Sequence, residues 1–122
     1  MPRENGQASG LSAARMSQLR AEIRHRGELS SLASLMNAAG NETRMRILYL
    51  LWRNCEVRVN DIAKILDLTT PAISQQLKKL RSQRLVATRR DAQTVYYRLN
   101  GDLELVNHIT GVFAKDALAH AA

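Results

Sequence analysis

Apolar residues recur at helical spacing along most of this 122-residue chain, and they alternate with polar residues in one later segment. A first helical stretch begins at Leu11 and is interrupted at Gly27. Gly40 and Asn41 mark the boundary between two later helices, because Gly favours helix C-termini and Asn is a good N-cap. The spacing predicts helices over residues 29–39, 42–51, 60–66, 70–83 and 102–120.

The alternating segment lies between the last two of these helices. Val86 and Thr88 are followed by Thr94–Leu99, which reads TVYYRL, and the polar residues Arg90–Gln93 between them predict a turn. We therefore expect a β-hairpin. Glu56–Val59 is rich in β-branched residues and is either a small strand or an extended connection.

The helices predicted at residues 60–66 and 70–83 are joined by a short turn. Thr69 or Thr70 supplies the N-cap of the second helix, and Pro71 suits its first turn, where no N–H is needed. Two short helices followed by a hairpin are the arrangement of a winged helix-turn-helix, so we expect a mainly α fold with about five helices and a β-hairpin wing. The side chains expected to face the core from these two helices are Ile62, Ala63, Ile65, Leu66, Ile73, Leu77 and Leu80.

Composition bears on the domain organisation. Residues 1–10 combine Pro, Gly and polar side chains without periodicity and predict a flexible tail, so we expect residues 11–122 to form one domain. Hydrophobic residues make up 45% of the chain and aromatic residues only 4%, which predicts a modest aliphatic core. Because small domains often bury more surface by pairing, we expect a dimer.

The apolar runs and the N-terminus indicate the cellular compartment in which we expect the protein. No run approaches the roughly 20 apolar residues that a membrane-spanning helix needs. The N-terminus lacks the apolar core of a signal peptide, and the single cysteine excludes an intrachain disulfide. We expect a cytoplasmic protein without a membrane partner.

The charge of the chain favours a polyanionic partner. Lys and Arg number 18 against 11 Asp and Glu, which gives a formal net charge of +7. A band of cations without any acid runs from residue 78 to residue 90 and is suited to neutralising DNA phosphates. Its members are Lys78, Lys79, Arg81, Arg84, Arg89 and Arg90.

The side of helix 70–83 opposite its apolar stripe predicts where bases are read. Ser and Gln side chains donate and accept hydrogen bonds at base edges, and an amide pairs well with adenine. We therefore interpret the chain as a sequence-specific binder of double-stranded DNA. The alternative is a basic, non-specific nucleoid or RNA-binding protein, which would need no such helix. The residues on this side are Thr70, Pro71, Ser74, Gln75 and Lys78.

An enzyme function finds no support in the sequence. The chain shows no nucleophile and base arrangement, no Gly-rich phosphate loop and no pair of acids placed as in a catalytic pocket. We expect neither catalysis nor a cofactor.

Three segments resemble the ArsR/SmtB family of bacterial repressors. They read NETRMRIL at residues 41–48, VNDIAKILDLTTPAISQQLKKLRSQRLV at residues 59–86 and RRDAQTVYYRL at residues 89–99. The resemblance runs from Leu29 to His120, and the wing segment is most similar to the nodulation-repressor and haemolysin-regulator branch.

The resemblance implies a homodimer held by the helices Leu29–Ala39 and Asp102–His120. It also implies a repressor that binds an imperfect inverted repeat and that a metal or redox signal releases. On the wing, it assigns DNA contacts to Arg89, Arg90 and Gln93.

The metal sites of the family are matched poorly. Arg58 and Asn60 stand where thiolates would be expected, and one cysteine cannot supply several sulfur ligands, so we expect no such site. Asp116 and His120 share a helical face and are candidates for a first-row metal, but their spacing departs from the pattern of the family.

Cys55 is a candidate redox residue. Its neighbours Arg53 and Arg58 would favour the thiolate, but the chain holds no second cysteine to resolve an oxidised thiol. The simpler interpretation is an ordinary, partly buried cysteine.

Overall fold

The computed structural model describes residues 10–119, and the side chains of residues 10–115. The chain forms two compact units that divide between Ala33 and Ser34. Most of the expected tail at residues 1–10, the side chain of Asp116 and all of His120 lie outside the described residues. No helix described between residues 10 and 119 has the length and apolar character needed to cross a membrane.

The first unit contains α1 (Ala13–His25) and the beginning of α2 (Gly27–Ala39). Ser12 caps α1, because its side chain accepts a hydrogen bond from the backbone N–H of Arg15 at 3.1 Å. The interruption expected at Gly27 falls at Arg26, and Gly27 is the first residue of α2.

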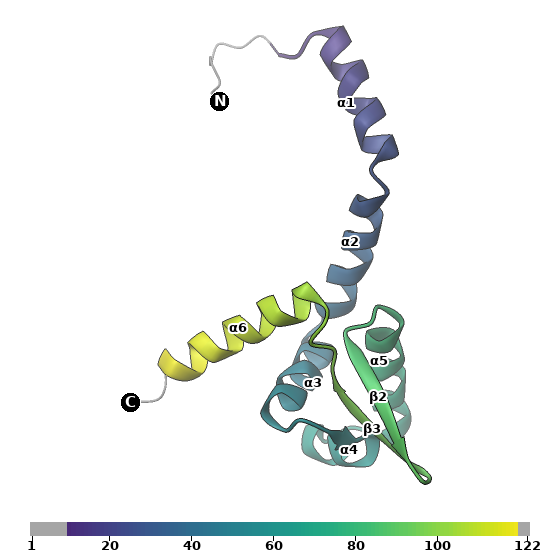
Figure 1. Ribbon diagram of the computed structural model, residues 1–122, viewed down its shortest axis with the longest axis vertical. Coiled ribbons are helices and arrows are strands. Elements are labelled where there is room, and N and C mark those ends of the chain that lie inside the picture. The colour runs from purple at the N-terminus through teal and green to yellow at the C-terminus, as the bar shows by residue number, and fades with distance from the viewer. Residues whose placement is uncertain (1–9, 120–122) are drawn as a thin grey trace. The chain divides into compact units, whose positions relative to one another are not determined.

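The second unit holds the end of α2, four further helices and a small sheet, coloured from blue through green to yellow in Figure 1. Its sheet has the order β1-β3-β2 and is antiparallel throughout. The elements are α3 (Glu42–Arg53), β1 (Val57–Arg58), α4 (Val59–Leu66), α5 (Thr70–Ser82), β2 (Val86–Asp91), β3 (Thr94–Leu99) and α6 (Glu104–Ala119).

Side chains and left-handed backbone fix the ends of these helices. Asn41 caps α3 through a hydrogen bond from the N–H of Arg44, as the sequence predicted. Asp67 ends α4 with φ of 59°, and Arg84 follows α5 with φ of 63°. Such conformations close a helix by turning the chain sharply, and they cost a residue with a Cβ about 1–2 kcal/mol.

An aliphatic core joins α3, α4, α5 and the sheet. The expected inward residues of α5 are fully buried. Burying a side chain of this kind contributes roughly 1.5–3 kcal/mol. The largest buried side chains are Ile47, Leu48, Leu51, Ile62, Ile73, Leu77, Leu80 and Leu85.

Three local expectations were wrong. Ile65 was expected in the core but is 59% exposed, because α4 ends one residue later and turns only Ile62 and Ala63 fully inward. Of the two alternatives for residues 56–59, the structure shows the small strand, at Val57–Arg58, and α4 begins at Val59, next to Asn60. The hairpin turn is shorter than Arg90–Gln93, since the strands pair as far as Asp91 and Thr94. The last helix begins at Glu104 rather than at Asp102.

Arg44 is the one charged residue among the buried side chains described. Its Nε donates to the carbonyl of Ala38 at 2.6 Å and its Nη2 to the carbonyl of Asn37 at 3.2 Å, so it satisfies the C-terminal end of α2. Its Nη1 donates to Oε1 of Gln76 on α5 at 2.8 Å. One side chain of α3 therefore joins α2 to α5.

We predict that Arg44→Met lowers the free energy of unfolding by about 2–4 kcal/mol, because it leaves buried acceptors unsatisfied. Arg44→Lys should recover only part of this loss, since an ammonium cannot reproduce the planar fork. The measurement is urea denaturation followed by circular dichroism.

Arg46→Met is the matched control. Arg46 lies two residues away and pairs with Glu42 on the exposed surface, where such pairs contribute at most about 1 kcal/mol. Equal losses for the two methionine variants would contradict a structural role for Arg44.

Candidate nucleic-acid interface

A tight turn holds α5 against α4. Asp67 and Leu68 donate backbone hydrogen bonds to the carbonyls of Lys64 and Ala63, at 3.3 and 3.0 Å. The side chain of Thr69 then caps α5 by accepting from the N–H of Ala72 at 3.2 Å. Of the two caps left open by the sequence, the structure selects Thr69.

One stripe of α5 is buried and the opposite stripe is exposed. The buried stripe is made by Ile73, Leu77 and Leu80, all at 0% exposure. The predicted base-reading residues all lie on the exposed side of α5. They are Thr70, Pro71, Ser74, Gln75 and Lys78, with Lys79 beside them.

Two further residues set the position of this helix. The hydroxyl of Thr70 lies 3.2 Å from Oδ1 of Asn60, to which it donates, so the first turn of α5 is tied to α4. Gln76 is half-buried and accepts from Arg44. Gln75 is exposed, so adjacent glutamines have opposite roles. The sequence interpretation missed Asn60, Gln76 and Arg44.

A hollow of about 470 Å³ lies beside α5 and β3. Ser74 and Lys78 contribute to it from the exposed side of α5, and Tyr97 contributes from β3. Tyr97 also packs against the core, whereas its neighbour Tyr96 lies under Arg89. The tyrosines therefore divide between the two faces of the wing, because successive side chains of a strand point to opposite faces.

Arg89 is the most constrained cation of the wing. Its Nε and Nη2 donate to the carboxylate of Glu56 at 2.8–3.1 Å, and its guanidinium carbon lies 4.7 Å from the ring centroid of Tyr96. The hydrogen bonds from Arg89 lower the pKa of Glu56, and the positive charges of Arg89 and Arg98 act in the same direction. The same contact with Glu56 raises the pKa of Arg89.

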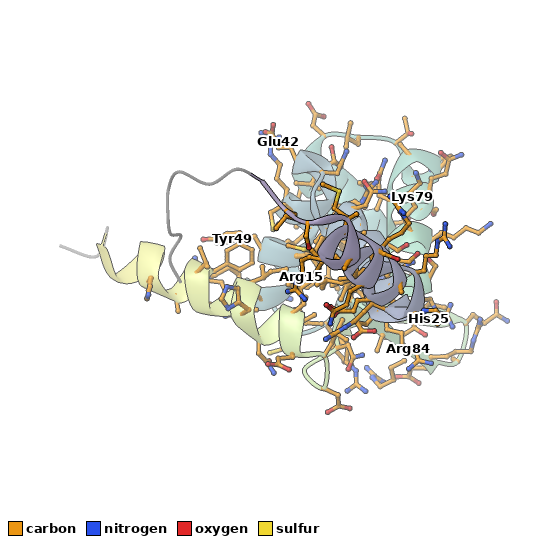
Figure 2. The ribbon with its side chains drawn as sticks, turned by 90° about the horizontal axis from the view of Figure 1, so that it is seen from above. Arg15, His25, Glu42, Tyr49, Lys79 and Arg84 are labelled. Atoms are coloured by element: carbon orange, nitrogen blue, oxygen red, sulfur yellow. The ribbon has the colours of Figure 1, made fainter. Side chains whose placement is uncertain are left out.

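The other cations of the predicted band have no such partner. Among the side chains described for residues 10–115, Arg89 is the only member of the band that forms a salt bridge. Figure 2 shows Lys79 and Arg84 on the side of the ribbon away from α6. Arg90 and Gln93, at the tip of the wing, are exposed. This surface therefore carries uncompensated positive charge that extends from α5 to the hairpin.

The candidate sensor residues are not brought together. Cys55 is exposed rather than partly buried, with Arg58 paired to Asp61 at 3.1 Å and Arg53 hydrogen-bonded to the hydroxyl of Tyr49 at 3.2 Å. Within the described part of the chain, no three His, Cys, Asp or Glu side chains are placed to share a metal ion.

Comparison with known proteins connects this geometry to a family. Residues 41–88, which span α3, α4, α5 and the start of β2, match the family model described as bacterial regulatory protein, arsR family. Nodulation protein NolR of Rhizobium meliloti is 38% identical over 86 residues, which is 69% of this chain and 70% of the relative.

Solved structures agree. HlyU from Vibrio cholerae superposes with a TM-score of 0.64 at 32% identity, covering 80% of this chain and 99% of that one. A homodimeric winged helix-turn-helix DNA-binding domain from Mycobacterium bovis has a TM-score of 0.64 at 25% identity, covering 94% of this chain and 96% of that one. The chain belongs to the arsR family of bacterial regulatory proteins, and it is a winged helix-turn-helix regulator of transcription.

Proposed function

We propose that the chain is a homodimeric repressor that binds an inverted-repeat operator in double-stranded DNA, with α5 in the major groove and the wing on the adjacent backbone. The observation that carries this proposal is the exposed polar side of α5 beside the cations of α5 and the wing, which apart from Arg89 form no salt bridge among the described side chains. Polar groups near the start of a helix read base edges, while the cations bind phosphates of any sequence.

The homodimer is supported by apolar side chains that the described structure leaves exposed. Leu29, Leu32 and Met36 follow one another at helical spacing on α2 and are each about half exposed, and Val112 on α6 is 56% exposed. The similar domain from Mycobacterium bovis is described as homodimeric. A two-fold axis would present two copies of α5 to the two halves of an inverted repeat, whose centres lie about one DNA turn, roughly 34 Å, apart for dimers of this type.

We predict that Gln75→Ala and Arg90→Ala have different effects on DNA binding. Gln75→Ala should reduce the preference for the operator over unrelated duplex by about 1–3 kcal/mol. Arg90→Ala should weaken binding to both duplexes alike and lower the slope of log K against log salt by about 1. Fluorescence anisotropy with the upstream region of the gene and a scrambled duplex, at several salt concentrations, measures both quantities.

Equal affinity of the unaltered protein for the two duplexes would support the non-specific alternative and contradict the proposal. If neither substitution changed binding, the assignment of α5 and the wing to DNA would be wrong.

Arg89 should contribute less to DNA affinity than Arg90, because Glu56 already occupies its guanidinium. We predict that Glu56→Gln raises DNA affinity and steepens the salt slope by about 0.9, the value for one further phosphate contact. Because the pKa of Glu56 is lowered in the fold, the native pair persists above the ordinary carboxyl pKa and is lost only as pH falls through the lowered value.

Asp61→Asn is the control for Glu56→Gln. It also removes one exposed negative charge from an arginine pair, but that pair involves Arg58 of β1 rather than the wing tip. If both variants gained the same affinity, the release of Arg89 would not be the cause.

We predict that Met36→Glu dissociates the homodimer. The substitution appears twice across a two-fold axis, so a loss of about 1.5 kcal/mol per copy raises the dissociation constant by at least about a hundredfold. Sedimentation velocity at several concentrations measures this constant. Leu68→Glu, at another exposed apolar position, on the turn before α5, should leave it unchanged. A dimer unaffected by Met36→Glu would contradict an interface on α2.

A further inference from the structure

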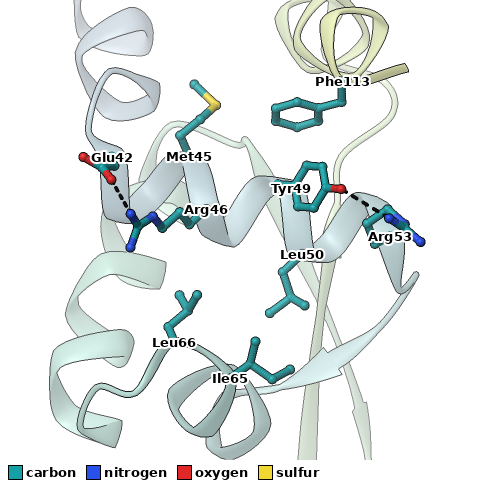
Figure 3. Close-up of a pocket in the computed structure, with 9 residues that line it drawn as sticks. All are labelled: Glu42, Met45, Arg46, Tyr49, Leu50, Arg53, Ile65, Leu66 and Phe113. Atoms are coloured by element: carbon teal, nitrogen blue, oxygen red, sulfur yellow. Dashed lines mark hydrogen bonds and ion pairs between the residues drawn. The ribbon is translucent and has the colours of Figure 1, made fainter. Parts of the chain in front are cut away.

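An apolar hollow of about 370 Å³ lies between α3, α4 and α6, and it plays no part in the proposed DNA contacts (Figure 3). Met45, Tyr49 and Leu50 line it from α3, Ile65 and Leu66 from α4, and Phe113 from α6. Its volume falls within the range of about 300–1,000 Å³ that is typical of small-molecule sites.

The apolar side chains that line the hollow are partly exposed, but contacts between aromatic rings hold several of them in place. Ile65 is 59% exposed and Tyr49 is 41% exposed. The rings of Tyr49 and Phe113 meet edge to face with centroids 5.3 Å apart, and Trp52 lies 5.7 Å from each of them. A ligand would therefore cover apolar surface without first having to order these aromatic rings.

Positive charge borders the hollow at both ends, with Arg46 on one side and Arg53 on the other (Figure 3). Glu42 neutralises Arg46 through a salt bridge. Arg53 donates only to the hydroxyl of Tyr49, and no carboxylate among the described side chains pairs with it. A guanidinium with free N–H groups binds a carboxylate through charge-assisted hydrogen bonds.

We propose that this hollow is an effector site for an amphiphilic carboxylate, with an alkyl chain against Leu50, Ile65 and Leu66 and its anionic head at Arg53. This site goes beyond the proposed function, because binding to it requires no DNA. Charge complementarity favours such a ligand, because the guanidinium of Arg53 forms no salt bridge among the described side chains. α4 is the first helix of the helix-turn-helix and supports α5. A ligand that separates Ile65 from α3 therefore moves α4, and α5 moves with it.

The binding test uses Trp52, the only tryptophan of the chain, as the reporter beside the hollow. The protein without DNA is titrated with straight-chain carboxylates from hexanoate to dodecanoate, and with decanol. We expect saturable quenching, with affinity rising up to about fourfold for each added methylene until the hollow is filled. No saturation by any carboxylate below its micelle concentration would overturn the proposal.

Two substitutions locate the site. Ile65→Glu places a carboxylate against the ligand and should weaken decanoate binding at least tenfold, while Leu68→Glu, at a similarly exposed apolar position outside the hollow, should not. Arg53→Gln should abolish the preference for decanoate over decanol. Equal effects of the two glutamates, or an unchanged preference in Arg53→Gln, would overturn the assignment.

The effector role is tested by operator affinity with and without saturating decanoate. We expect a reduction of at least fivefold, and by linkage the operator should weaken decanoate binding by the same factor. Unchanged operator affinity with full ligand occupancy would overturn the effector role. Failure to bind any operator would instead contradict the proposed function, and the fluorescence titration would still decide whether the site exists.

Discussion

Arg44 places its guanidinium between the last carbonyls of α2 and the side chain of Gln76 on α5, and it does so inside the core. A buried cation is tolerated only when its donors find acceptors, and here the acceptors belong to two different helices. Neither helix can move away from α3 without leaving the charge unsatisfied. Within the second unit, the C-terminal end of α2 and the helix that carries the polar groups suited to DNA are thus held together by a single residue.

The arginines of the wing differ in whether they have an acidic partner. Arg89 forms a salt bridge, whereas the other wing cations form none among the described side chains. Residues Arg89, Tyr96 and Arg58 lie in one register across β2, β3 and β1, and Glu56 immediately precedes β1. The pair of Arg89 and Glu56 therefore links the two outer strands over the middle one. Arg90, the next residue of β2, forms no salt bridge among the described side chains and so remains available to a ligand. The wing therefore has one arginine that is held by an acidic partner and another that remains available to bind a ligand.

Most of the fold followed from the sequence because several helices carry a local start signal and an apolar stripe of their own. Asn41, Thr69 and the apolar stripe of α5 act through neighbours within four residues, so local pattern predicted them. Contacts between distant segments were harder to predict, as with Arg89 and Glu56, which are 33 residues apart. Arg44 did leave a signal, since it precedes Ile47, Leu48 and Leu51 at the spacing of the buried stripe of α3. A charged residue on a core stripe indicates a buried polar contact, although its partners cannot be read from spacing.

The exposure of Ile65 has the same origin as the hollow beside it. α4 is eight residues long, so it buries one narrow stripe against α5 and leaves the side facing α3 and α6 only partly covered. α3 meets this space with Tyr49 and Leu50, and it meets α5 through Arg44 on another side of the helix. Because close-packed cores transmit displacement rather than absorb it, a change in the distance between α3 and α4 would also be felt at α5. Such a regulator requires no metal ligands, because a change in the packing of α4 also changes the position of α5.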